Sequence, residues 1–137
     1  MARYLIVANQ TLGGEHLTEK VREVMAPGAS FYVLVPATPP QGHAVFTEGE
    51  ARAIAAERLE AALIRLRDLG AEVDGEVGGE EPTAAVRDVM RDQEFDEIII
   101  STLPAGVSRW LKLDLVSNVK RAFDLPVTHI EGEGELT

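Results

Sequence analysis

The sequence predicts an α/β fold: a single doubly wound sheet of five parallel strands in the order 3-2-1-4-5, with helices on both faces, as in Rossmann-like and flavodoxin-like proteins. Two observations predict it. Five strand-like apolar segments alternate along the chain with four helical segments, a pattern typical of parallel strands joined by right-handed crossovers. The third and fifth strands carry features of sheet edges, and this order places those two strands outermost.

The first two strands are expected to be buried on both faces. Tyr4–Ala8 and Phe31–Val35 are continuous apolar runs, as is typical of central strands in a parallel sheet. Between them, apolar residues recur at helical spacing from Leu17 to Val24. The proline-rich segment Pro36–Phe46 then predicts an irregular loop that is long for a connection between a strand and a helix.

The next helix has the clearest boundaries. Thr47 and Glu50 have the spacing of a capping box, and Gly70 lies where a left-handed residue ends a helix. Its apolar stripe, which we interpret as core packing, consists of Ala55, Leu59, Ala62, Leu66 and Leu69. From Ala71 to Val77, small or apolar residues alternate with acidic ones. This third strand should therefore have one buried face and one wet face, as an edge strand does.

The remaining elements complete the alternation. Pro82 suits the first turn of a third helix, and Phe95–Ile100 predicts a fourth strand that ends in two hydroxyl residues. A loop and short turn over 103–113 lead into the last helix. Leu125–Ile130 predicts the fifth strand, and Pro126 marks a strand start or an edge because proline lacks the ladder N–H.

Length, charge and composition bound the function. The chain has 137 residues, a formal net charge of −10 and no cysteine. We expect one domain over 1–130 and an acidic, mobile tail over 131–137. The negative charge disfavours nucleic acid, and no apolar run approaches the roughly 20 residues of a membrane span. The three histidines share no element, so no metal site is expected, and a cytoplasmic protein fits these features.

A ligand site is expected where the winding of the sheet reverses, between the carboxyl ends of strands one and four. The polar residues that could converge there are Asn9, Gln10, Thr11, Ser101, Thr102, Ser108, Arg109, Ser117 and Asn118. Pro36–Phe46 could be a lid over them. The nearby basic residues, Arg109, Lys112, Lys120 and Arg121, could meet phosphate or complement a helix dipole and neighbouring acids. No acid, base or nucleophile has a supporting partner, so we predict no catalytic residue and no enzyme activity.

Taken in order, five pieces of the chain resemble the universal stress protein family. They are Tyr4–Thr11, Gly79–Pro82 followed by Ala85 and Val86, Asp96–Thr102, Val116 with Ser117, and Leu125–Val127. The resemblance spans Tyr4 to Ile130 and implies a non-enzymatic, stress-associated or regulatory protein. It also implies a homodimer paired through the fifth strand, with Val127, His129 and Ile130 in the interface. The sequence points to no other protein partner.

The resemblance fails at the nucleotide motif. ATP-binding members carry Gly-x-x-Gly, nine residues, then Gly and Ser or Thr, and these positions fall here on Ser101, Pro104, Asp114 and Leu115. Pro104 removes an N–H donor, and Asp114 is expected to cap the following helix and repel phosphate. Asn9 stands at the family's ribose-binding Asp. Each lost charge-assisted contact is worth about 1.5–3 kcal/mol, so we expect no ATP cofactor.

The alternative is a protein of another class that binds a nucleotide or small molecule in a rebuilt pocket at the same crevice. It retains the polar residues between strands one and four but not the phosphate-binding glycines. A bound ligand would favour this hypothesis over a ligand-free regulatory protein.

Overall fold

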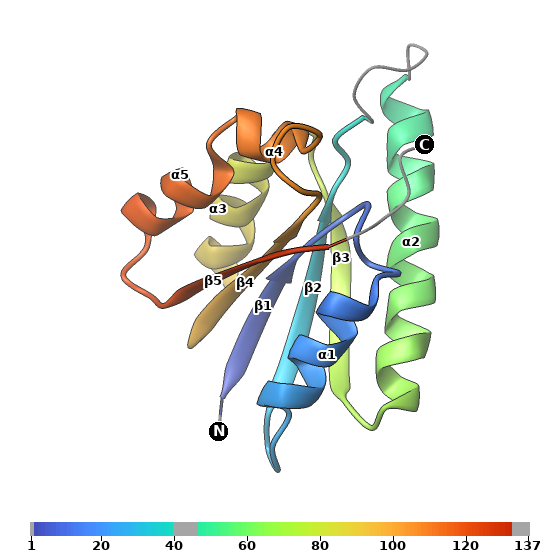
Figure 1. The fold of residues 1–137 in the computed structure, drawn as a ribbon, viewed down its shortest axis with the longest axis vertical. Coiled ribbons are helices and arrows are strands. Elements are labelled where there is room, and N and C mark those ends of the chain that lie inside the picture. The colour runs from blue at the N-terminus through green and yellow to red at the C-terminus, as the bar shows by residue number, and fades with distance from the viewer. Residues whose placement is uncertain (1, 40–46, 133–137) are drawn as a thin grey trace.

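The computed structural model describes residues 2–39 and 47–132, which contain one five-stranded parallel sheet (Figure 1). Its order is β3-β2-β1-β4-β5, which confirms the predicted topology. The strands are β1 (Arg3–Val7), β2 (Ser30–Pro36), β3 (Glu72–Gly78), β4 (Glu97–Thr102) and β5 (Val127–Glu131). β1 and β4 lie side by side, with Leu5 opposite Ile98 and Val7 opposite Ile100. The winding therefore reverses between these two strands, as predicted.

Helices cover both faces of the sheet, as predicted (Figure 1). They are α1 (Glu15–Val24), α2 (Glu48–Asp68), α3 (Pro82–Asp92), α4 (Arg109–Lys112) and α5 (Leu115–Ala122). α1 and α2 pack on one face, and α3, α4 and α5 pack on the other. The short turn expected over 103–113 contains the single helical turn α4. Ser108 accounts for it, because its hydroxyl accepts a hydrogen bond from the backbone N–H of Leu111 at 3.2 Å.

The alternation of β1 divides the apolar side chains between two cores. Ile6 and Ala8 join the core under α1 and α2, whereas Leu5 and Val7 join the core under α3 and α5. All four side chains are fully buried. This explains the continuous apolar run of the sequence, because a central strand has no wet face.

The predicted boundaries of α2 are confirmed. The Thr47 hydroxyl accepts from the N–H of Glu50 at 3.1 Å, and the Glu50 carboxylate accepts from the N–H of Thr47 at 3.4 Å. Gly70 follows the helix with φ of +95°, a left-handed conformation that glycine adopts without a steric penalty. This long helix covers β2 and β3.

Both predicted edge strands lie at the edges. In β3, Val73 is buried while Glu72, Asp74 and Glu76 are exposed. Gly75 has no room for a side chain, because a Cβ there would collide with the carbonyl of Val33. The strand can therefore approach β2 closely only with glycine at this position.

Two sequence predictions lie largely outside the described residues. The proposed lid, Pro36–Phe46, is described only as far as Pro39, and the acidic tail is described only to Gly132. Within the ranges given above, no helix is long and apolar enough to cross a membrane.

Candidate functional site

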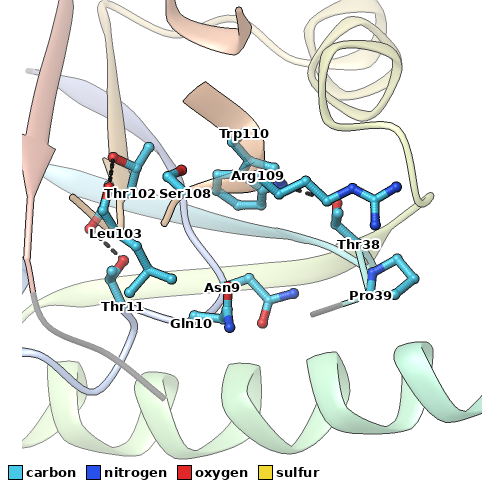
Figure 2. A pocket seen from close by; sticks show the side chains of 11 residues that line it. Asn9, Gln10, Thr11, Thr38, Pro39, Thr102, Leu103, Ser108, Arg109 and Trp110 are labelled. Carbon is cyan, nitrogen blue, oxygen red and sulfur yellow. Dashed lines mark hydrogen bonds between the residues drawn. The ribbon is translucent and has the colours of Figure 1, made fainter. Parts of the chain in front are cut away.

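The carboxyl ends of β1, β2 and β4 surround a small pocket, with α4 forming its opposite wall (Figure 2). The residues that line it are Asn9, Gln10, Thr11, Thr38, Pro39, Ser101, Thr102, Leu103, Ser108, Arg109 and Trp110. The free cavity among them is about 20 Å³, which is room for a single water molecule. The pocket therefore lies where the topology predicts a ligand site, but the chain's own side chains nearly fill it.

Most of the predicted pocket residues come together here. Asn9, Gln10, Thr11, Ser101, Thr102, Ser108 and Arg109 all line the pocket. Ser117 and Asn118 do not. Ser117 is exposed on α5, and the Asn118 amide donates to the carbonyl of Leu113 at 3.3 Å. Their helix begins beyond α4, which separates them from the strand ends.

Asn9 uses both ends of its amide within the chain. It is 5% exposed; its Nδ2 donates to the carbonyl of Pro36 at 2.8 Å. Its Oδ1 accepts from Nη1 of Arg58 on α2 at 2.7 Å. The residue thus ties the end of β1 to the end of β2 and to α2. A ligand could bind this amide only by displacing one of these partners.

The hydroxyl groups at the end of β4 are also engaged. Thr11 and Ser101 lie with their hydroxyl oxygens 2.5 Å apart. The Thr102 hydroxyl donates to the carbonyl of Leu103 and lies 2.8 Å from Nε2 of His129. Because a hydroxyl has one proton, Thr102 must accept from His129. The His129 ring therefore carries a proton on Nε2 and joins β5 to the pocket wall.

Trp110 closes the pocket from the α4 side. Trp110 is 7% exposed, and its Nε1 donates to the Thr38 hydroxyl at 3.0 Å. Thr38 in turn donates to the carbonyl of Glu80 at 2.6 Å. This chain of bonds connects α4 to the loops that follow β2 and precede α3. Figure 2 shows the indole directed toward Thr38 across the pocket.

Arg109 is the cation at the pocket mouth. Its side chain is half-buried, and its guanidinium extends toward Thr38 and Pro39 in Figure 2. Within residues 2–39 and 47–132 it has no hydrogen-bond or ion-pair partner. It is therefore the group at this site best able to receive an anion.

The positions of the altered nucleotide motif have separate structural roles. Pro104 is exposed and begins a turn whose Val107 N–H donates back to its carbonyl at 3.1 Å. Leu115 is fully buried in the core under α5. The expectation that Asp114 caps α5 is wrong, because its side chain makes no capping bond. Its φ of 56° is left-handed, whereas a capping side chain needs an extended backbone to reach the first N–H groups.

Sequence reasoning named neither Leu103 nor Trp110 as a pocket residue, and it placed Thr38 and Pro39 only within the segment proposed as a lid. The predicted order held one usable signal: strand two neighbours strand one, so the residues after strand two must meet the same crevice. Nothing in the sequence pattern indicates that Trp110 reaches it, because a single helical turn has too few residues for periodicity.

A second hollow lies at the opposite, amino end of the strands, among Arg3, Tyr32 and Asp74 and their neighbours. Tyr32 donates to the Glu76 carboxylate at 2.7 Å. Burial, and then this bond, raise the pKa of the Tyr32 phenol. None of the predicted site residues lies there. Across the part of the chain described, no three His, Asp or Glu side chains gather as a metal site would require.

Comparison with known proteins supports the fold. No protein-family model and no curated protein matches the sequence. Among solved structures, the chain resembles a universal stress protein from Archaeoglobus fulgidus, with 20% identity, a TM-score of 0.63, and coverage of 96% of this chain and 94% of that one. It also resembles a universal stress protein family protein from Arabidopsis thaliana, solved with AMP bound. That match has 10% identity, a TM-score of 0.64, and coverage of 96% and 92%. The chain has the fold of these proteins, as the resemblance implied.

Proposed function

We propose that this chain is a cytoplasmic, non-enzymatic protein of the universal stress type, with a stress-associated or regulatory role and without tight ATP binding. The shared fold supports the type. One observation carries the absence of tight ATP binding: at the switch point, the protein's own groups pair with the polar side chains and leave a cavity of about 20 Å³.

Energetics support this proposal. A ligand that bound Asn9 would have to replace its bond to the Arg58 guanidinium, and hydrogen bonds to charged groups contribute about 1.5–3 kcal/mol. The phosphates would also meet Pro104, which offers no N–H, and the carboxylate of Asp114. Tight ATP binding therefore requires both a new loop and a reorganised crevice.

A specific observation favours the second candidate, a binder of a nucleotide or small molecule in a rebuilt pocket. Arg109 is half-buried, and its guanidinium lies at the pocket mouth with no partner in the described parts of the chain (Figure 2). Arginine pairs well with phosphate and carboxylate oxygens. Since the Arabidopsis protein was solved with AMP bound, AMP is the nucleotide that tests this candidate most directly.

The proposal is tested by calorimetric titration of MgATP and AMP into the wild type and into Pro104→Gly/Asp114→Gly. Leu115 is left unchanged, because it is fully buried and a serine there would disrupt the core. We expect no MgATP binding at micromolar concentrations by the wild type and a gain of at least tenfold in affinity by the variant, the equivalent of about 1.4 kcal/mol.

Micromolar MgATP binding by the wild type would contradict the first candidate. For the second candidate, Arg109→Gln is the matched control, because it keeps the length and hydrogen bonding of the side chain but removes its charge. AMP binding that this change abolishes would favour a rebuilt anion pocket.

The proposed assembly is a homodimer paired through β5. β5 is an outermost strand, and Val127, His129 and Ile130 are half-buried along it. Half-buried side chains on an outer strand are suited to a further pairing.

A further inference from the structure

Trp110 extends from the short helix α4 into the crevice at the strand ends. It is the only tryptophan in the sequence and lies on a helix of four residues. The residue is 7% exposed and belongs to the same apolar cluster as Leu115 and Val119. It also lines the pocket at the switch point, where the sheet would accept a ligand.

The partner of the indole N–H is chemically selective. The Thr38 hydroxyl donates its one proton to the carbonyl of Glu80, at 2.6 Å. Its oxygen must therefore accept from Trp110, whose Nε1 can only donate. Thr38 is half-buried. A ring without an N–H in this space would leave its hydroxyl oxygen without a hydrogen-bond donor.

α4 has few other ties to the fold. Ser108 caps it locally, and its backbone bonds run within 108–114. Among the residues that the structure describes, the bond from Trp110 to Thr38 is the only side-chain hydrogen bond that joins α4 to the loops at the strand ends. Ser108, directly before it, is buried, whereas Val107 and Leu113, at its two ends, are exposed. The indole and its single bond therefore hold α4 in place.

We propose that Trp110 is an internal occupant of a binding site for a planar aromatic molecule with an N–H donor. The Thr38 hydroxyl accepts a hydrogen bond from the N–H of the molecule, and the apolar cluster packs against its ring. The site opens when Trp110 and α4 move out of the crevice. A molecule of this class competes with Trp110 for the crevice. Removal of the indole leaves a vacancy that the same class of molecule fills.

Indole itself is the probe for the opened site. Trp110→Ala should lower the unfolding midpoint by about 10 °C or more, because a large buried ring is lost. Millimolar indole should raise the midpoint of this variant by about 4 °C or more, and that of the wild type by less, because in the wild type indole must first displace Trp110. 1-Methylindole, which lacks the N–H, should give at most half of that shift.

Phe95→Ala is the matched control, because Phe95 is also buried, at 6% exposure, in the same cluster but before β4, at the amino end of the strands. Indole should not stabilise it. Equal stabilisation of both variants, or equal effects of indole and 1-methylindole on Trp110→Ala, would reduce Trp110 to an ordinary core residue and overturn the proposal.

A second measurement holds even if Trp110→Ala does not fold. Thr38→Val keeps the shape of the side chain and removes the acceptor. Acrylamide quenching of the single tryptophan should then rise about fivefold, the factor expected for one lost hydrogen bond. Unchanged quenching would mean that Thr38 does not hold the indole and would contradict the proposal. Neither measurement uses ATP or AMP, so failure of this proposal is distinguishable from failure of the proposed function.

Discussion

Asp114 has a left-handed backbone conformation, which glycine adopts more easily than other residues. It has φ of 56° and ψ of 36°, and no other non-glycine residue in the described ranges has a positive φ. This is the position at which ATP-binding members of the resembled family carry a glycine. Aspartate tolerates the left-handed region better than most residues, because its short polar side chain can bond locally. The turn at Asp114 therefore has a backbone conformation that glycine would adopt freely.

Substitutions at Asp114 should reveal this backbone strain. Asp114→Ala should lower the free energy of unfolding by about 1 kcal/mol, because alanine has no local bond to offset the left-handed conformation. Asp114→Gly should leave it within about 0.5 kcal/mol of the wild type, since glycine adopts this conformation freely. Urea unfolding of the three proteins measures the difference. Equal losses in both variants would show that the carboxylate, rather than the backbone, matters here.

At the scale of elements, the two edges of the sheet differ in how they are protected. The N–H of Ala37 donates to the carbonyl of Gly78 in β3, so the backbone groups of the even-numbered residues of β3 bond to β2 and those of Val73 point away from the sheet. Arg67 donates to that outward carbonyl of Val73 at 3.0 Å. Its guanidinium also lies 3.9 Å from the Asp74 carboxylate. The edge of β3 is therefore partly closed by a side chain of α2.

The edge of β5 has no such cover among the described residues. The N–H of Ile98 donates to the carbonyl of Pro126, and the N–H of Gly132 donates to the carbonyl of Thr102. The even-numbered residues of β5 thus bond inward, so the backbone groups of Val127 and His129 face outward. These are the groups that a second copy of the strand would pair with.

Val127→Pro should weaken the proposed dimer without breaking the fold. It removes an outward N–H that no ladder bond within the chain uses, and proline is tolerated at the first residue of a strand. We expect the dissociation constant to rise at least tenfold, the equivalent of about 1.4 kcal/mol. Light scattering across a dilution series measures it. Val77→Pro, which makes the same change on the edge of β3, should leave assembly unaffected, and a monomeric wild type at micromolar concentration would refute the dimer.

At the scale of the whole molecule, the fold was predictable because its signals are local. The apolar run of β1 and the capping box at Thr47 can each be recognised within a few neighbouring residues. The closure of the pocket depends instead on pairs far apart in sequence. Trp110 and Thr38 are 72 residues apart, and Thr11 and Ser101 are 90 apart. Periodicity carries no information about such pairs, so the site could be placed from the sequence but its filling could not.

The charge of the whole chain should make stability depend on salt. The formal net charge is −10, and ion pairs such as Arg67 with Asp74 and Arg91 with Asp88 are exposed. Exposed pairs contribute about 0–1 kcal/mol each, so repulsion among the excess acids should dominate. Raising NaCl from about 0.05 to 0.5 M shortens the screening length severalfold and should raise the free energy of unfolding by about 1 kcal/mol. Glu72→Lys changes the net charge from −10 to −8 and should reduce this gain in urea unfolding, whereas a loss of stability on adding salt would show that attractive pairs prevail.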